Sequence, residues 1–309
     1  MKRISLTIGI PTIGDNDFIF AAVASALAEL PVDGEIIVSD NAGLAPETVR
    51  RLSEIDPLGR LRIVRQAERI SMGDNWNCCL REARGDFFIL LSDDDLLLSG
   101  FVQEACGFLS DESFSMVVSR INWINESGKS FWVSPPVPPQ EACVELLFGV
   151  FAKKRVVLPC ATMFRRKELL AVGGYDSSYG NWADMKAWVA VGAAYGPAKL
   201  INKPLAAYRE RLSSLTKSVN DKAWRDAMEK TVFFAASVLP EKSSEVLIKG
   251  RVYVEYMLAD IKMKRCLGGA ESLWQASRLT WIACAALPFD NKIWLLMKMV
   301  FLRLKASRS

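Results

Sequence analysis

Residues 86–95 read DFFILLSDDD, in which the apolar run 87–91 is followed directly by Ser92, Asp93, Asp94 and Asp95. An apolar run of this length after a glycine predicts a buried strand. Three successive carboxylates repel one another and cannot be buried together without partners. Because ligands bind beyond the carboxyl ends of strands in open α/β sheets, the triplet is a candidate site for a divalent cation and a diphosphate. The alternative is a solvated acidic turn before a helix.

The segments before this strand alternate between strand and helix patterns. Apolar runs predict strands over 4–10, 35–39, 61–65 and 86–91, and helical spacing predicts helices over 18–30, 46–55 and 74–84. Strands that read as continuous apolar runs between helices indicate a parallel sheet that is covered on both faces. The N-terminal half is therefore predicted to be an α/β doubly wound domain.

The pattern is less regular after the acidic triplet. We expect a helix over 99–109, a strand over 115–119, a loop over 134–139 (SPPVPP) and a helix over 184–194. From residue 220 onward the sequence is helical throughout, so we place a domain boundary near 217. The predicted architecture is a mostly parallel sheet with helices on both faces, followed by an α-helical C-terminal region.

Composition excludes several classes of function. The 309 residues contain no histidine, which excludes Ser-His-Asp and Cys-His nucleophile systems and His-ligated zinc sites. A general base must then be a carboxylate, Lys, Tyr or Cys, and a metal site must be rich in oxygen, which favours Mg²⁺ or Mn²⁺. The formal charge is +4, and the last twenty residues carry five basic side chains against one acidic. The rest is neutral, so no broad nucleic-acid surface is expected.

Cysteine usage and the N-terminus favour a cytosolic protein. The seven cysteines are odd in number, form no C-x-x-C pair and lie mostly among apolar neighbours, as reduced core thiols do. The N-terminus MKRISLTIGIPT has no long apolar stretch or cleavage site and is better interpreted as a first strand. No run reaches the roughly 18 apolar residues of a membrane-spanning helix.

Two further polar loops follow predicted strands. Residues 38–43 (VSDNAG) contain Asp40 and Asn41, which could hydrogen-bond a base or ribose or form an Asx turn. Residues 11–16 (PTIGDN) could pass close to a nucleotide or form a plain strand-to-helix turn. Neither a G-x-G-x-x-G fingerprint nor a P-loop is present. Because all three loops follow parallel strands, they should lie at one edge of the sheet and form one site.

In order and spacing, four motifs over about 95 residues resemble the nucleotide-sugar-dependent glycosyltransferases of family 2, which have the GT-A fold. They are GIPTIGDNDF, IIVSDNAG, MGDNWNCCLREARGD and FFILLSDDDLL. The resemblance continues to about residue 217 through Gly173-Gly174-Tyr175-Asp176, the segment NWADMKAW (181–188) and Tyr208-Arg209. It implies a GT-A domain over 1–217, with a nucleotide-sugar-binding half (1–98) and an acceptor half (99–217), and a helical region over 218–309.

The resemblance also implies roles for individual residues. Asp184 would be the catalytic base, Asp94 and Asp95 would hold Mn²⁺ or Mg²⁺, and Trp182 is a candidate acceptor contact. Contacts to the nucleotide or donor sugar are implied for Pro11, Thr12, Gly14, Asp40, Asn41, Asn77, Asp93, Arg209 and Arg211. From the residues alone, Asp184 can equally be a carboxylate that stabilises the start of a helix.

The chain departs from the family pattern in three places. Ala183 stands where an acidic residue usually precedes the catalytic Asp, and Ser92 begins the acidic motif. The segment after Tyr208-Arg209 often includes a His, whereas this chain has Arg211 near that place. An arginine can hold a diphosphate without binding metal, so the strength of metal dependence stays open.

The resemblance implies a nucleoside diphosphate sugar as donor and a glycan or lipid-linked glycan as acceptor, in bacterial surface-polysaccharide synthesis. Residues 292–305 (KIWLLMKMVFLRLK) combine a broad apolar arc with flanking basic residues. Such a helix suits either a membrane interface or packing in the core or in a homodimer. We expect a cytoplasmic protein, peripheral on the inner face of the cell membrane if the first alternative holds.

Two other functions remain open. A non-catalytic nucleotide-sugar-binding scaffold fits the loss of acid at Ala183 and the absence of histidine. A sugar nucleotidyltransferase usually needs a Gly-rich loop with basic residues after the first strand, and PTIGDNDF contains no basic residue.

Overall fold

The computed structural model describes residues 5–211 and 220–266. The chain divides into two compact units, Met1–Leu212 and Ser213–Ser309, and each is described here by itself. The boundary of the units lies a few residues before the predicted one near 217.

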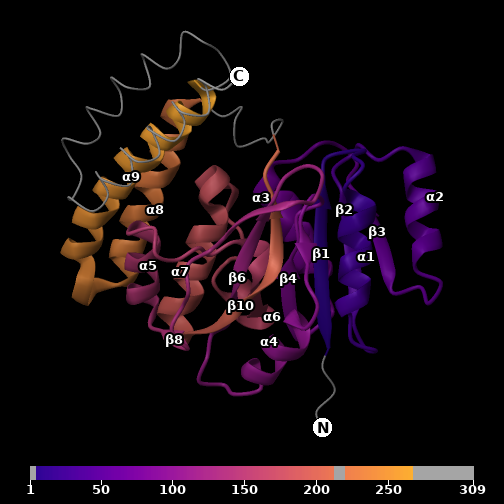
Figure 1. The fold of residues 1–309 in the computed structure, drawn as a ribbon, viewed down its shortest axis with the longest axis horizontal. Coiled ribbons are helices and arrows are strands. Elements are labelled where there is room, and N and C mark those ends of the chain that lie inside the picture. Colours follow the sequence, from indigo (N-terminus) through magenta and orange to yellow (C-terminus); the bar gives the residue numbers. More distant parts are fainter. Residues whose placement is uncertain (1–4, 212–219, 267–309) are drawn as a thin grey trace. The chain divides into compact units, whose positions relative to one another are not determined.

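The first unit is built on one ten-stranded sheet (Figure 1). Its strands are β1 Leu6–Thr12, β2 Glu35–Asp40, β3 Leu61–Arg65, β4 Phe87–Leu90, β5 Leu96–Leu97, β6 Met116–Ile124, β7 Ser130–Val133, β8 Gln140–Glu141, β9 Thr162–Arg165 and β10 Ala198–Arg209. The strand order is β3-β2-β1-β4-β9-β6-β10-β5, with β7 beside β6 and β8 beside β10. Strands β1, β2, β3, β4, β6 and β10 run in one direction, so the sheet is mostly parallel, as predicted.

Helices cover both faces of this sheet. They are α1 Ile19–Glu29, α2 Pro46–Ile55, α3 Met72–Glu82, α4 Phe101–Leu109, α5 Cys143–Phe151, α6 Arg166–Ala171 and α7 Ala183–Tyr195, with short 3₁₀ helices η1 Pro159–Ala161 and η2 Ser177–Trp182. Buried side chains of α1 and α4 pack with Ile8, Val38 and Ile89 in one core cluster. Helices α3 and α7 lie on the opposite face, where Gly192 approaches Met116.

The absence of a side chain at Gly9 sets the distance between α3 and the sheet. A Cβ atom at this position would lie 2.6 Å from the Cβ of Cys79 and 2.9 Å from the ring of Phe88. Both distances are shorter than real contacts, so only glycine lets α3 pack this closely on β1. The first turn of α3 is thereby held against the ends of β1 and β2, where the polar loops begin.

Strand β1 extends further than the sequence suggests, because Pro11 does not end it. Pro11 pairs with Ser39 of β2, whereas the pairing of β1 with β4 ends at Gly9 and Leu90. The carbonyl of Gly9 accepts a hydrogen bond from Leu91, so the ring nitrogen two residues later faces the side on which β4 has ended. No ladder hydrogen bond is lost, and the strand continues to Thr12.

The second half of the sheet was predicted less completely. The predicted strand over 115–119 continues to Ile124 in β6, and the short strands β5, β7, β8 and β9 were not predicted. Strand β9 runs antiparallel between β4 and β6, which joins the two parallel parts of the sheet. Four residues of mixed character (Thr162–Arg165) carry too little periodicity to show this.

The second unit is helical where the structure describes it. Helix α8 (Asp221–Val238) and helix α9 (Ser243–Cys266) are joined by the 3₁₀ helix η4 (Pro240–Lys242). Arg225 pairs with Glu255 between the two helices, and a Cβ atom at Gly250 would overlap Val232. Within the described ranges, no helix has the length and apolarity to cross a bilayer. Residues 292–305 lie outside the described residues.

Candidate functional site

The predicted site residues of the first half gather at the carboxyl edge of the sheet. Strands β1, β2, β4 and β10 point in one direction, so Thr12, Asp40, Leu90 and Arg209 end them on the same side. The loops after β1, β2 and β4 therefore share one edge, as expected from their positions in the sequence.

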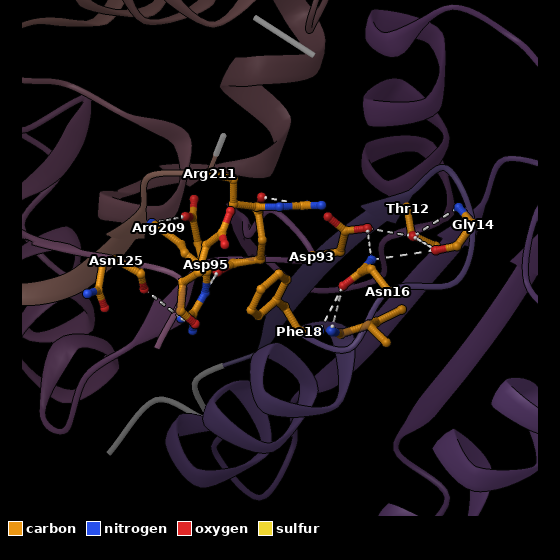
Figure 2. Close-up of polar contacts among 12 residues, drawn as sticks. Thr12, Gly14, Asn16, Phe18, Asp93, Asp95, Asn125, Arg209 and Arg211 are labelled. Carbon is orange, nitrogen blue, oxygen red and sulfur yellow. Dashed lines mark hydrogen bonds and ion pairs between the residues drawn. The ribbon is translucent and has the colours of Figure 1, made fainter. Parts of the chain in front are cut away.

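Asp93 is held by the loop after β1. Its Oδ2 accepts hydrogen bonds from the Thr12 hydroxyl at 2.6 Å and from the Asn16 amide at 2.8 Å (Figure 2). Burial raises the pKa of Asp93 to about 6, and the hydrogen bonds from Thr12 and Asn16 only partly oppose this rise. The loop around Gly14 is compact, because its Cα would lie 2.7 Å from a Cβ at Gly43. Pro11 is buried in β1 and positions this loop.

Asp94 and Asp95 both find partners at the end of β10, Asp94 in an ion pair and Asp95 in a hydrogen bond. Asp94 is 22% exposed at its side chain, and its Oδ2 lies 3.1 Å from Nη1 of Arg211. Asp95 is only 2% exposed, and its Oδ1 accepts a hydrogen bond from the backbone N–H of Arg209. Burial and the charge of Asp94 raise the pKa of Asp95, while hydrogen bonds from Arg209, Cys160 and Ser92 lower it.

Arg209 joins three loops. Its Nε donates to the carbonyl of Asp94 at 2.8 Å, and its Nη1 donates to the carbonyls of Asn125 and Glu126 in the turn after β6. The guanidinium carbons of Arg209 and Arg211 lie 4.6 and 5.1 Å from the ring centroid of Phe18 (Figure 2). This cation–π contact fixes both arginines beside the acidic loop. The side chain of Arg209 is thus used within the fold, whereas Arg211 is partly exposed.

Asp40 and Asn41 are both used to shape the loop after β2. Asp40 is fully buried; its Oδ1 accepts from the N–H groups of Gly43 and Leu44, and its Oδ2 accepts from Nε of Arg65 at 2.6 Å. The amide of Asn41 both donates to and accepts from the backbone of Ile70, at 2.9 and 2.8 Å. Asp40 therefore makes the hydrogen bonds to the following backbone that the Asx-turn interpretation predicts. Contacts of either residue to a donor stay a prediction.

Asn77 makes the same kind of two-point contact with Tyr175, 98 residues away. Its Nδ2 donates to the carbonyl of Tyr175 at 2.7 Å, and its Oδ1 accepts from the N–H of Tyr175 at 2.9 Å. A Cβ atom at Gly174, where φ is +63°, would lie 2.4 Å from this Oδ1. The Gly-Gly-Tyr-Asp segment is therefore clamped against α3, and the side chain of Asn77 is occupied by this clamp.

Asp184 begins α7 and carries a perturbed carboxyl group. Its Oδ1 accepts from the backbone N–H of Met185 at 2.7 Å, and no cation pairs with it among the described residues. Burial raises the pKa of Asp184 to about 6 against this backbone hydrogen bond. The residue lines a small hollow together with Tyr175, Trp188 and residues around β9. A carboxylate with this pKa can accept a proton near neutral pH.

The two residues before Asp184 are packed inside the protein. Trp182 is 8% exposed and Ala183 is 0% exposed. A carboxylate at position 183 would be buried in this packing, which gives a physical reason for alanine there. Stacking of an acceptor sugar on Trp182 stays a prediction. It requires the Trp182 ring to be more exposed to solvent than it is in this structure.

Sequence reasoning missed three residues that hold the site. Asn16 accepts from the N–H groups of Phe18 and Ile19 while it donates to Asp93, Asn75 bonds Ser39 and the carbonyl of Thr12, and Arg65 pairs with Asp40. An Asn just before a helix is a recognisable capping signal. The roles of Asn75 and Arg65 depend on tertiary contacts and have no local signal.

The side chains present can hold a divalent cation only together with other ligands. Asp94 offers a partly exposed carboxylate, whereas Asp95 is enclosed beside Arg209. In the described part of the chain, no group of three or more Cys, Asp or Glu side chains converges. A single carboxylate with phosphate oxygens and waters is a usual Mg²⁺ arrangement, so Asp94 fits a cation that is shared with a diphosphate.

The sequence model of the family "Glycosyl transferase family 2" matches residues 7–171 of this chain. The matched residues contain all three polar loops. The chain belongs to glycosyltransferase family 2. The matched part covers the donor half and part of the acceptor half but ends before Asp184, so the family assignment does not rest on that residue.

Solved structures show the same fold over nearly the whole chain. S. aureus TarS 1–349, in complex with UDP-GlcNAc, is 14% identical with a TM-score of 0.69, covering 98% of this chain and 88% of that one. The mannosyltransferase PcManGT of Pyrobaculum calidifontis, in complex with GDP-Man and Mn²⁺, is 19% identical with a TM-score of 0.57, covering 99% and 87%. Both structures share the GT-A fold of this chain.

A curated relative is more similar in sequence but is itself without a described function. The uncharacterized protein MT1568 of Mycobacterium tuberculosis is 24% identical over 200 residues. The match spans 60% of this chain and 60% of the relative.

Replacing Asp93 by Asn should stabilise the protein at high pH. The native carboxyl has a pKa raised to about 6, so its charged form costs stability above pH 6, and this cost disappears as the pH falls towards 3.8. Asn keeps an oxygen for Thr12 and Asn16. We expect Asp93→Asn to gain about 1–2 kcal/mol at pH 8 and almost nothing near pH 4, measured by urea unfolding. Asp86→Asn, on an exposed side chain at the other end of β4, is the control, and an Asp93→Asn variant no more stable than the native protein at pH 8 would refute the assignment.

Proposed function

We propose that the protein is an inverting glycosyltransferase that moves a sugar from a nucleoside diphosphate sugar to an acceptor hydroxyl. Family membership and the shared fold support the reaction class. The observation that carries the mechanism is Asp184, a carboxyl group at the start of α7 with no paired cation among the described residues and a pKa raised to about 6.

In this mechanism the Asp184 carboxylate accepts the proton of the acceptor hydroxyl as its oxygen attacks the anomeric carbon of the donor. The bond from that carbon to the diphosphate breaks, and the electron pair leaves with the diphosphate. One carboxylate base and a direct displacement invert the configuration at that carbon. A pKa near 6 leaves Asp184 mostly ionised at pH 7 and still basic enough to take the proton.

The leaving diphosphate gains negative charge, which the donor loops must stabilise. Arg211 is partly exposed beside Asp94 and can turn towards phosphate oxygens with its planar guanidinium. A bound Mn²⁺ or Mg²⁺ would be held by Asp94 and would supply a further positive charge at the diphosphate. Asp93 and Asp95 keep this loop in shape through Thr12, Asn16 and Arg209.

The acceptor is proposed to be a glycan or a lipid-linked glycan, processed at the cytoplasmic face of the cell membrane. The support is the basic amphipathic pattern of residues 292–305. Truncation at residue 290 should reduce sedimentation of the protein with anionic liposomes, at equal folding of the two forms by circular dichroism. Equal sedimentation of both forms would reject the membrane part of the proposal and favour packing in a core or a dimer.

Asp184→Asn should remove the base while leaving the donor loops unchanged. We expect the transfer rate to fall by about 10²–10⁴-fold, with the affinity for the nucleoside diphosphate within twofold of the native value. Transfer is measured with a panel of nucleotide sugars and acceptors, and affinity by calorimetry. Asp176→Asn is the matched control, because the Asp176 carboxylate caps η2 by accepting hydrogen bonds from Ser178. Native-like transfer by Asp184→Asn would exclude it as the base.

Asp94→Ala should weaken the metal-dependent part of nucleotide binding. In the native protein we expect Mn²⁺ or Mg²⁺ to increase the affinity for one of UDP, GDP, dTDP or CDP, as a rise in melting temperature at fixed nucleotide concentration. The variant should lose most of this increase. Asp86→Ala, at the opposite end of β4, should retain it. The same metal-dependent increase in Asp94→Ala as in the native protein would remove Asp94 from the cation site.

A further inference from the structure

A buried hydroxyl group lies beside the proposed base and has no assigned role. Tyr175 is 1% exposed, and its hydroxyl has no hydrogen-bond partner among the described residues. A buried polar group without a partner costs about 1–3 kcal/mol, so an unused hydroxyl would readily be replaced by phenylalanine. The Tyr175 hydroxyl therefore needs a hydrogen-bond partner other than the described side chains and backbone, such as a water molecule.

Tyr175 and Asp184 line the same small hollow. Its lining is mostly apolar and includes Leu158, Phe164 and Trp188, and the lining residues that carry polar side-chain groups are Tyr175, Asp184 and Thr162. The hollow has room for about one water molecule, and two to four polar partners are what a buried water needs. The Thr162 hydroxyl donates to the carbonyl of Leu158, so its oxygen can still accept.

The phenol is held rigidly at this position. Asn77 fixes both backbone polar groups of Tyr175, at 2.7 and 2.9 Å. The ring packs edge-on against Trp76, with ring centroids 5.4 Å apart. The neighbouring Gly174 takes a φ of +63°, where a side chain would collide with Asn77. The Tyr175 ring is therefore held in one place at the lining of the hollow.

We propose that one buried water joins the Tyr175 hydroxyl to the Asp184 carboxylate, and that Tyr175 is thereby the positioning residue of the base. The Tyr175 hydroxyl donates to the water, and the water donates to the carboxylate. This link orients the carboxylate whose Oδ1 is already fixed by Met185, and it favours the ionised form that accepts the proton. The catalytic part of the inference rests on the proposed function; the link itself does not.

The other charged groups around α7 are engaged elsewhere. Lys186 donates to the carbonyl of Val172 and lies near Asp176 of η2. Arg165 at the end of β9 pairs with Glu168 of α6, and on α5 Glu145 lies near Cys143. Among the described residues none of these groups pairs with Asp184. Burial raises the pKa of the Tyr175 phenol, and the charge of Asp184 raises it further. Tyr175 is thus the titratable neighbour through which the carboxylate can be tuned.

Tyr175→Phe tests the inference, because it removes only the hydroxyl. We expect the acidic limb of the pH–rate profile to move up by about one pH unit, since the ionised carboxylate loses its donor. The turnover number at pH 6.5 should fall several-fold, while the KM for the donor stays unchanged. Tyr256→Phe is the matched control, because Tyr256 is also buried beside an aspartate, Asp260, but lies in α9. An unmoved acidic limb in Tyr175→Phe would overturn the catalytic part.

A double-mutant cycle tests the link without any activity. Unfolding by urea is measured for the native protein, Tyr175→Phe, Asp184→Asn and the double variant, at pH 7.5 and pH 4. The two substitutions should be coupled at pH 7.5, where Asp184 is charged, and nearly additive at pH 4, where it is protonated. Additivity at both pH values would overturn the link. Coupling in a protein that transfers no sugar would retain the link and reject the proposed function instead.

Discussion

Three adjacent carboxylates at the end of β4 must be accommodated at one edge of the sheet, and much of the surrounding structure serves that need. Each carboxylate has its own solution: neutral donors from the loop after β1 for Asp93, an arginine for Asp94, and a backbone N–H for Asp95. These partners come from β1, from the end of β10 and, through Arg209, from the turn after β6. Hydrogen bonds and one ion pair to these carboxylates thus bring together segments that the chain separates by more than a hundred residues.

Asparagine side-chain amides form the hydrogen bonds that backbone groups of these loops need. Asn41 on Ile70 and Asn77 on Tyr175 each satisfy one N–H and one C=O that lie outside the ladder of the sheet. A primary amide is the one side chain that matches a peptide group in both donor and acceptor, which makes it suited to irregular loops that cannot be left unpaired. The loops of the site are therefore rigid through hydrogen bonding more than through apolar packing.

The same residues show how far sequence reasoning reaches. The parallel strands β1 to β4 and the common edge of their loops follow from apolar runs and turn residues, because those signals are local. For Asp40, Asn41 and Asn77 the motifs imply contacts to the donor, which stay a prediction, and a motif does not show that the same side chains also clamp the backbone. Pro11 marked a strand end only because the sequence does not show on which side its neighbour has stopped. Strand β9 and the contacts of Asn75 and Arg65 depend on pairings between distant segments.

Asp93 and Asp184 share a pKa raised to about 6 by burial, yet only one of them is suited to be the base. Asp93 is held by two donors on one oxygen, inside the loop that must stay fixed for the donor nucleotide. Asp184 is held by backbone donors alone, lies in the first turn of α7 and lines a hollow that Tyr175 also lines. The raised pKa alone does not separate the two carboxylates; the number and place of their donors do.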